Sequence, residues 1–241
     1  MKEKVIFYNK NKEHLTGDLF IPDKLKKKKL PAVMYVHGLL SSRNSRKSRA
    51  LLERLYPQDF IFFRFDSYGR GDSYGDLKNL TLTKQIDCVD KAFNTLFFHR
   101  VVDTSSIFII GSSFGGLAAL LWAANDNRVR SLALVAPALN LCSDKLPDSL
   151  IVDYLSDLFY EDLKNYNPYE EAEKINCPVL VVHGKEDIVV PVSCTEKLPK
   201  HLKNCIVELI DNADHLFESE ESFNHVINSI DDFIQNPVID S

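Results

Sequence analysis

Two adjacent serines separate an apolar run from a pair of glycines in the stretch IFIIGSSFGG, residues 107–116. The pattern Gly-x-Ser-x-Gly fits with Ser113 at its centre, because Gly111 and Gly115 then lie two residues before and after it. A serine at the tip of a sharp strand-to-helix turn has a strained backbone, and only small residues fit at those two positions. With Ser112 at the centre, an isoleucine and a phenylalanine would occupy them. Ser113 is therefore the predicted nucleophile.

A serine hydroxyl needs a base, and the base needs a carboxylate that orients it. In the chain order that accompanies this serine motif, the acid follows the serine and the histidine comes last. Asp187 follows the strand-like run 179–182, and His215 follows the run 206–210. Both residues then reach the sheet edge that holds Ser113. The sequence predicts a catalytic triad with Ser113 as nucleophile, His215 as general base and Asp187 as the orienting acid.

Two further histidines and one further aspartate lie near predicted strand ends. His37 and His183 each follow a strand, and we expect both to pack beside the site rather than to act as the base. Asp214 is the chain neighbour of His215, and adjacent side chains usually diverge, so Asp187 is the better orienter. The remaining histidines lie in polar or helical contexts and are expected at the surface: His14, His99, His201 and His225.

Backbone N–H groups beside the serine could stabilise the oxyanion that forms during acyl transfer. Phe114 follows the serine at the start of a predicted helix, and the turn directs its N–H toward the reacting centre. Upstream, the predicted strand 32–36 runs into HGLL, residues 37–40. The glycine allows a close backbone approach, so the N–H of Leu39, or that of Leu40, could complete the oxyanion hole. The ring of Phe114 is also expected to narrow the pocket floor.

Short apolar runs alternate with segments of helical periodicity along the chain. This alternation predicts an α/β fold, with a mostly parallel central sheet of about eight strands and helices on both faces. The first two strands are expected to form an antiparallel hairpin. The expected strands lie at 5–8, 15–21, 32–36, 60–65, 107–110, 132–135, 179–182 and 206–210, and the expected helices at 45–55, 83–98, 114–125, 193–202 and 222–234.

One long interval interrupts the alternation. We expect a single domain, 1–241, in which residues 138–177 form an inserted helical cap over the carboxyl ends of the strands, where ligands of such sheets bind. The alternative is an ordinary surface excursion. Apolar residues recur in the interval at helical spacing and predict an apolar roof over a pocket: Leu150, Ile151, Leu155, Leu158 and Phe159.

The composition is that of a globular protein and excludes several classes of function. The chain has 241 residues, 45% of them hydrophobic, and can bury a sizeable core. Its net charge of -5 gives no global preference for nucleic acid or an anionic membrane. The longest apolar run, 117–124, is too short for a membrane span, and the N-terminus lacks an apolar signal region, so the expected location is cytoplasmic. The five cysteines are scattered without CxxC spacing, and no metal or cofactor is expected.

A basic segment, RNSRKSR at residues 43–49, follows the predicted oxyanion loop and contains no acid. It could attract anionic substrates, such as a carboxylate-bearing acyl group or a phosphorylated leaving group. It could equally be the solvated start of a helix.

With these motifs, the sequence resembles the serine α/β-hydrolases over nearly its whole length. The resemblance implies that the stretch RFDSYGRGDS, residues 64–73, is a structural turn after the fourth strand, without a catalytic role. Among subgroups, the sequence is similar to small-cap cinnamoyl-ester-type esterases and to ABHD-type acyl thioesterases. The matching stretches are HGLL (37–40), RFDSYGRGDS (64–73), GSSFGG (111–116), HGKEDIVVP (183–191) and NADH (212–215).

The expected function is hydrolysis of small-molecule carboxylic esters or thioesters through an acyl-enzyme intermediate. A non-catalytic binding protein that keeps the same fold is a further hypothesis, and the intact triad argues against it. A serine aminopeptidase-like peptidase is the other alternative. It would need acids that bind a free α-amino group, for which the cap offers Asp144, Asp148, Asp153, Asp157 and Glu161.

Overall fold

The computed structural model describes residues 1–23, 29–142 and 154–237. Within these residues, one eight-stranded sheet has the order β1-β2-β4-β3-β5-β6-β7-β8. The predicted fold class is confirmed. The strands are β1 (Lys2–Tyr8), β2 (His14–Phe20), β3 (Leu30–Val36), β4 (Ile61–Asp66), β5 (Val102–Ser112), β6 (Ser131–Val135), β7 (Val179–Gly184) and β8 (Cys205–Ile210).

The strand directions follow from the sequence pattern. β1 and β2 form the expected antiparallel hairpin, and β2 pairs antiparallel with β4. All the other neighbours pair in parallel. Every residue of β4, β6 and β7 is buried, as expected for parallel strands that helices cover on both faces. The carboxyl ends of β3, β5, β6, β7 and β8 therefore share one edge of the sheet.

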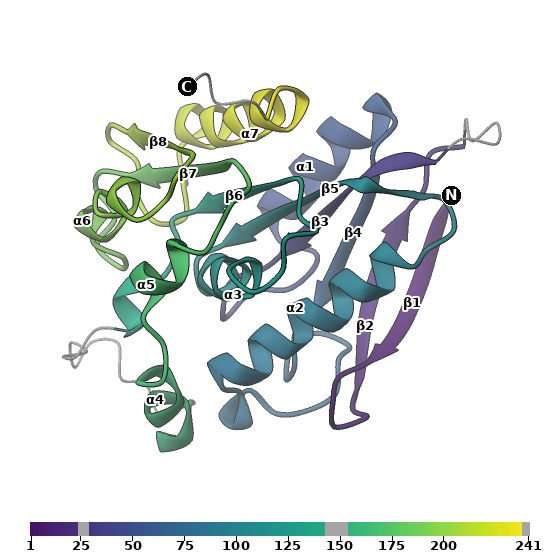
Figure 1. Cartoon of the computed structure of the whole chain (residues 1–241), viewed down its shortest axis with the longest axis horizontal. Helices are drawn as coiled ribbons and strands as arrows, with labels where there is room; N and C mark the ends of the chain where they lie inside the picture. The colour runs from purple at the N-terminus through teal and green to yellow at the C-terminus, as the bar shows by residue number, and fades with distance from the viewer. Residues whose placement is uncertain (24–28, 143–153, 238–241) are drawn as a thin grey trace.

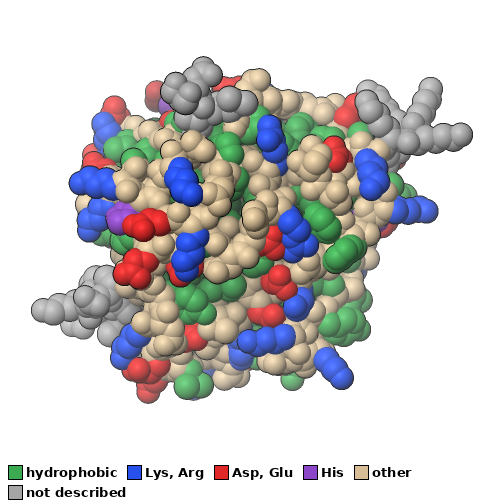
Figure 2. All heavy atoms as spheres, in the orientation of Figure 1, with side chains coloured by type: hydrophobic (Ala, Val, Ile, Leu, Met, Phe, Trp, Pro, Cys, Tyr) green, Lys and Arg blue, Asp and Glu red, His purple; other side chains and the backbone are tan. Residues whose placement is uncertain are grey.

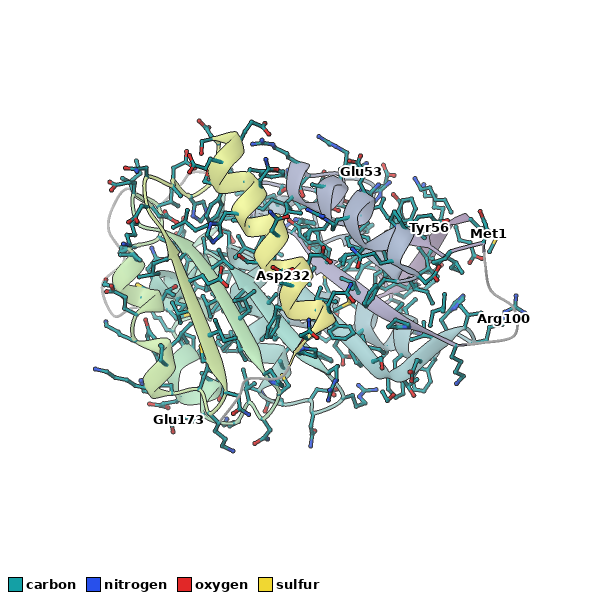
Figure 3. The ribbon with its side chains drawn as sticks, turned by 90° about the horizontal axis from the view of Figure 1, so that it is seen from above. Met1, Glu53, Tyr56, Arg100, Glu173 and Asp232 are labelled. Atoms are coloured by element: carbon teal, nitrogen blue, oxygen red, sulfur yellow. The ribbon has the colours of Figure 1, made fainter. Side chains whose placement is uncertain are left out.

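Helices cover the two faces of this sheet (Figure 1). On one face lie α1 (Arg46–Leu55) and α7 (Glu220–Gln235), which run side by side in Figure 3. On the other face lie α2 (Leu82–Phe97) and α3 (Phe114–Ala123). Each helical layer buries its own apolar cluster against the sheet, so the core has two parts. Most of α3 is apolar on every side, because it packs between the sheet, α2 and the interval that follows β6.

The prediction of one continuous helix over 193–202 is wrong. The structure has a single short turn, α6 (Val192–Thr195), and then a separate 3₁₀ turn over Leu198–Lys200. Pro199 explains the break, because proline lacks the N–H that a helix interior requires and its ring clashes with the preceding turn.

The interval 138–177 contains two short helices, α4 (Asp157–Leu163) and α5 (Pro168–Ala172). The start of α2 holds α4 through hydrogen bonds of 2.7 Å and 2.6 Å, from the Thr83 N–H and hydroxyl to the Asp162 carboxylate. Leu155 and Phe159 are buried, as the apolar pattern predicts, but Leu158 is 67% exposed and does not belong to that face. Leu150 and Ile151 lie outside the described residues. The division into one domain with a cap at 138–177 stays a prediction.

The surface carries charges of both signs, interspersed over the face that Figure 2 shows. No helix among the described residues is long and apolar enough to cross a membrane. Within the same residues, no cluster of three or more His, Cys, Asp or Glu side chains could hold a metal ion.

Candidate active site

The turn between β5 and α3 holds Ser113 in an unusual conformation. Its φ of 54° and ψ of −120° lie outside the regions that side-chain-bearing residues normally adopt. A Cβ on Gly115 would lie 2.4 Å from the His37 carbonyl oxygen, and a Cβ on Gly111 would lie 2.7 Å from the Gly116 Cα. Both positions therefore require glycine, as the motif predicts. The partly exposed serine is held by a rigid turn at the carboxyl end of a central strand.

The structure brings the three predicted triad residues together. His215 Nε2 lies 3.0 Å from Ser113 Oγ, and His215 Nδ1 lies 2.7 Å from Asp187 Oδ2. These separations allow a proton to pass from the serine to the imidazole while the carboxylate fixes the orientation of the ring. The His215 side chain is 13% exposed, and that of Asp187 is fully buried.

Close packing between two loops brings the acid to the histidine. A Cβ on Gly184 would lie 2.2 Å from the Ala213 carbonyl oxygen, so the loop after β7 can approach the loop after β8 only because residue 184 is glycine. The Glu186 N–H donates to that same oxygen at 3.0 Å. Asp214, the alternative orienter, instead accepts the Glu218 N–H at 3.1 Å.

The Asp187 carboxylate is fully engaged. Burial alone would raise its pKa, but hydrogen bonds from His183, His215 and the Val190 N–H outweigh burial and hold the pKa well below its usual range. Its Oδ1 accepts the N–H groups of Val189 and Val190 at 2.9 Å and 2.8 Å. Asp187 is therefore a carboxylate throughout the neutral pH range.

The sequence predicted that His183 packs beside the site, but it did not identify the residue that His183 contacts. It is completely buried, with Nε2 3.1 Å from Asp187 Oδ2 and Nδ1 2.7 Å from the Thr195 hydroxyl. It thus packs beside the site, as expected, and also contacts the same carboxylate oxygen as His215. Its place at the end of a strand, four residues before the acid, is the only sequence signal for this contact.

His37 orients the peptide group that precedes Leu39. The Ser67 N–H donates to His37 Nε2 at 3.0 Å, so the ring proton is on Nδ1, which donates to the Gly38 carbonyl at 2.7 Å. Burial lowers the pKa of His37, which favours this neutral form. Because a trans peptide is planar, fixing the Gly38 carbonyl directs the Leu39 N–H to the opposite side. A Cβ on Gly38 would lie 3.4 Å from Ser113 Cβ, so this peptide group is beside the serine.

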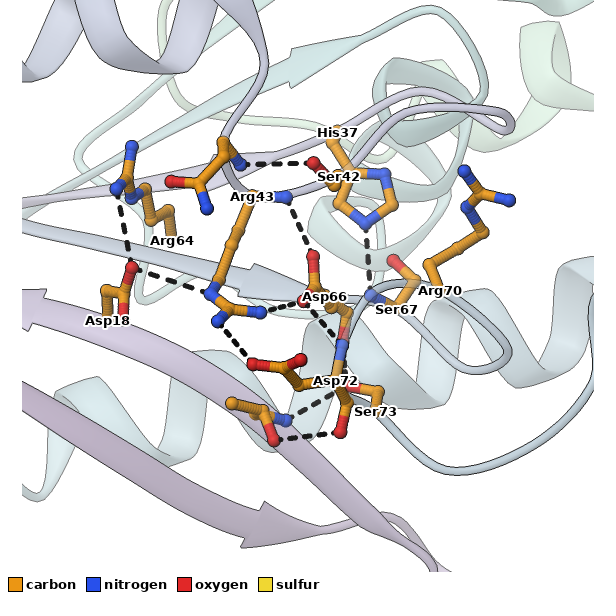
Figure 4. Close-up of polar contacts among 12 residues, drawn as sticks. Asp18, His37, Ser42, Arg43, Arg64, Asp66, Ser67, Arg70, Asp72 and Ser73 are labelled. Carbon is orange, nitrogen blue, oxygen red and sulfur yellow. Dashed lines mark hydrogen bonds and ion pairs between the residues drawn. The ribbon is translucent and has the colours of Figure 1, made fainter.

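Two arginines hold the rest of this loop, and Figure 4 draws the contacts of one of them, Arg43. Arg70 donates to the Leu40 carbonyl at 2.9 Å and to the Ser41 carbonyl at 3.0 Å. Arg43 pairs with the buried Asp66, and its side chain also reaches two more acids, Asp18 at 3.4 Å and Asp72 at 2.7 Å. The stretch 64–73 is thus the anchor of the predicted oxyanion loop. Sequence reasoning identified it as a structural turn without finding its partner.

A cavity of about 740 Å³ opens beside Ser113 and His215. Its apolar lining includes Phe114, whose ring lies 5.6 Å from that of Phe159 between centroids, so the aromatic side chain does form part of the pocket wall. A second hollow, of about 790 Å³, lies at the amino ends of β5, β6 and β7, away from the serine. The cavity at the triad is therefore the candidate substrate site.

The described acids of the interval after β6 do not line this cavity. Asp157 is exposed, and Glu161 pairs with Lys164 at 2.6 Å on the surface. The other acids proposed for binding an α-amino group, Asp144, Asp148 and Asp153, lie outside the described residues.

A family model described as the prolyl oligopeptidase family matches residues 67–239, which include all three triad positions. The chain belongs to this family. Among similar proteins, the zebrafish (Danio rerio) lysophosphatidylserine lipase ABHD12 is 28% identical over 181 residues, covering 70% of this chain but only 46% of that protein. The human (Homo sapiens) mitochondrial palmitoyl-protein thioesterase ABHD10 is 28% identical over 233 residues, covering 86% of this chain and 74% of that protein.

Solved structures agree on the fold. Est1E from Butyrivibrio proteoclasticus with ferulic acid bound superposes with a TM-score of 0.85 at 22% identity, covering 96% of this chain and 98% of that one. The mouse α/β-hydrolase domain-containing protein 10 superposes with a TM-score of 0.72 at 21% identity, covering 98% and 100%. This member of the prolyl oligopeptidase family thus has the α/β-hydrolase fold that the sequence motifs predict.

Proposed function

We propose that this protein is a serine hydrolase that cleaves carboxylic esters or thioesters. The observation that carries the proposal is the continuous contact from Ser113 Oγ through His215 to Asp187, at 3.0 Å and 2.7 Å, beside a largely apolar cavity. The names of similar proteins support the same chemistry, because they include a lipase and a palmitoyl-protein thioesterase.

The proposed reaction has two halves. Ser113 Oγ attacks the acyl carbon while its proton passes to His215 Nε2, and the N–H groups of Leu39 and Phe114 stabilise the oxyanion. The tetrahedral intermediate then expels the alcohol or thiol, which takes the proton from His215. Water, deprotonated by the same nitrogen, attacks the acyl-enzyme and releases the acid and the free serine. Asp187 remains ionised and stabilises the imidazolium in both halves.

The most direct test is reaction with a fluorophosphonate probe, followed by a panel of p-nitrophenyl esters, acyl thioesters and aminoacyl amides. We expect covalent labelling and turnover of esters or thioesters. Absence of labelling in the folded protein would support a binding protein instead.

The second candidate is a peptidase, and the family model's description favours it. Against it, the described cap acids that were predicted to bind a free α-amino group, Asp157 and Glu161, do not line the cavity. Preferential turnover of aminoacyl amides in the same panel would reverse this ranking. The cytoplasmic location stays a prediction, since the name of one similar protein places it in mitochondria.

Lengthening the acyl chain of a p-nitrophenyl ester from acetyl to medium length should raise kcat/KM until the pocket is full. Each buried methylene contributes up to about 0.8 kcal/mol. Leu155 and Phe159 line the pocket and are 7% and 1% exposed, so polar substitutions there should flatten the series and leave acetyl hydrolysis largely intact.

Leu158→Gln is the matched control for this series, because Leu158 is in the same segment and is 67% exposed. If the wild-type series is already flat, or if Leu155→Gln slows all chain lengths equally, residues 155–159 only pack against the core.

Removing the hydrogen bonds from Arg70 to the Leu40 and Ser41 carbonyls should lower kcat by roughly tenfold with a smaller effect on KM. The Arg70→Met variant frees the Leu40 and Ser41 carbonyls, so the backbone beside the Leu39 N–H is held less firmly, while His37 still holds the Gly38 carbonyl. Complete removal of an oxyanion donor costs about 10²–10³ in kcat, and a loosened donor should cost less. Steady-state kinetics on one ester provides the measurement, and the exposed Arg130→Met serves as control. An effect confined to KM or to thermal stability would contradict an oxyanion-positioning role.

A further inference from the structure

The cavity beside Ser113 has two unlike ends. One end is apolar and comes from the cluster on the α2–α3 face of the sheet, with Phe114, Leu141 and Phe159 in its lining. The other end comes from the start of α1 and the segment before α7, and it carries charge. Among its described lining residues, Arg46 and Lys47 are the cations and Glu218 is the acid. A substrate that fills both ends is therefore apolar on one side and charged on the other.

Lys47 differs from the arginines of the basic segment 43–49. Arg43 pairs with the buried Asp66 of the oxyanion-loop anchor, and Arg46 pairs with Glu220 at 2.7 Å and stacks on the Phe223 ring at 3.7 Å. Arg49 donates to the Asn44 carbonyl. In the part of the chain that the structure describes, no hydrogen bond or ion pair joins the Lys47 ammonium to another residue.

Lys47 is half-buried and lines the cavity, and burial withdraws its ammonium partly from water. The Lys47 ammonium lies 5.2 Å from the centroid of the Phe217 ring. Arg46 is the neighbour of Lys47 in the same cavity wall. Withdrawing a cation from water without a partner is unfavourable, so an anion that enters the cavity would meet a charge that water screens only in part.

Lys47 lies against the loop that carries His215, because its ammonium is 5.2 Å from the ring centroid of Phe217, two residues after that histidine. The acids whose charges act on it are Asp214, the chain neighbour of His215, and Asp187, which holds the His215 ring. The leaving oxygen or sulfur must come within reach of His215 Nε2, because that nitrogen gives it a proton. The proposed oxyanion donors are elsewhere: the Leu39 N–H belongs to the Gly38–Leu39 peptide, and the Phe114 N–H is at the start of α3.

We propose that Lys47 binds an anionic group, a carboxylate or a phosphate, on the leaving-group part of the ester or thioester. This inference rests on the proposed hydrolase function and adds the class of substrate. The basic segment as a whole is thus not the anion site, because its arginines are occupied. Glu218 does not neutralise Lys47: its side chain is exposed at the rim and forms no ion pair with it among the described contacts.

The experiment compares three nitrophenyl octanoates that differ only in one ring substituent of the leaving group: a carboxylate, a phosphate monoester or a neutral carboxamide. The readout is the ratio of kcat/KM for each anionic ester to that for the carboxamide ester. Wild-type protein should prefer the anionic esters, and the ranking of carboxylate against phosphate identifies the anion.

In the Lys47→Gln variant, this ratio should fall by roughly ten- to hundredfold, as expected when one charged hydrogen bond is lost. Lys47→Arg should restore most of the ratio, and Arg49→Gln, which removes a neighbouring exposed charge, should leave it unchanged.

A fourth ester carries its carboxylate at the far end of the acyl chain. If Lys47→Gln lowers the rate of that ester instead, the leaving-group assignment is overturned.

Different results would contradict anion binding by Lys47 and the hydrolase function itself. If the carboxamide ester is hydrolysed and the fluorophosphonate probe labels the protein, but Lys47→Gln leaves the ratio unchanged, Lys47 does not bind the anion and hydrolysis stands. If neither labelling nor hydrolysis occurs in the folded wild type, the hydrolase proposal fails and this inference fails with it.

The pH dependence of the same ratio gives a second readout. Burial lowers the pKa of the Lys47 ammonium to about 8; the charges of Asp214 and Asp187 oppose this lowering and that of Arg46 adds to it. The ammonium is charged below its pKa and neutral above it, so the wild-type preference for anionic esters should decline as the pH rises through about 8. The rim acid Glu218 and the catalytic histidine act on all the esters, so the carboxamide reference accounts for most of their influence. A ratio that stays constant from pH 6 to pH 10 would overturn the assignment to Lys47.

Discussion

The Ser113→Ala variant is expected to lose covalent labelling by a fluorophosphonate probe and to lower kcat for an ester by about a millionfold, the scale seen when a triad serine is removed. The reason is geometric. Ser113 Oγ is the hydroxyl within 3.0 Å of His215 Nε2, and the left-handed turn presents it to the cavity. Labelling measured by mass spectrometry and single-ester kinetics together check the result.

Ser112→Ala is the matched control, since Ser112 is the chain neighbour and has the same chemistry. Ser112 is 7% exposed and is the last residue of β5, where it pairs in register with Val135. This variant should keep substantial labelling. Equal loss in both variants, with circular dichroism showing an intact fold, would leave the assignment to Ser113 unsupported.

Replacing Asp187 with asparagine should lower kcat by up to about 10⁴-fold, by analogy with serine-protease triads. An amide cannot stabilise the imidazolium that forms on His215, and its NH₂ group can favour the wrong tautomer of the ring. Asp214→Asn should cost far less, because the Asp214 carboxylate accepts a hydrogen bond from the Glu218 N–H, whereas His215 Nδ1 is bonded to Asp187. The comparison uses kcat for one ester at neutral pH.

Stability must be measured alongside, because Asp187 also accepts the N–H groups of Val189 and Val190. The asparagine oxygen can keep these two bonds, so we expect the variant to remain folded. If the ranking of the two variants is reversed in folded protein, the orienting role moves to Asp214.

The sequence by itself determined the features that depend on neighbouring residues. Short apolar runs located the six strands from β3 to β8, and the first two strands were predicted as an antiparallel hairpin, which the structure contains. Ser113 could be distinguished from Ser112 because the required glycines are two residues away, within one turn. Asp187 and His215 followed from the chain order that accompanies the serine motif and from topology, since parallel strands bring their carboxyl ends to one edge.

The tertiary structure decided which distant side chains meet. The contact of Asp187 with His215, the pairing of Arg43 with Asp66, and the contact of the Lys47 ammonium with the Phe217 ring join residues that are far apart in the sequence. Composition showed a basic segment at 43–49, but whether each cation is neutralised depends on acids that the fold delivers from other strands. Periodicity has no access to such pairings, because it describes only which face of an element a residue occupies, while a charge or hydrogen bond depends on the atom that packing places opposite it.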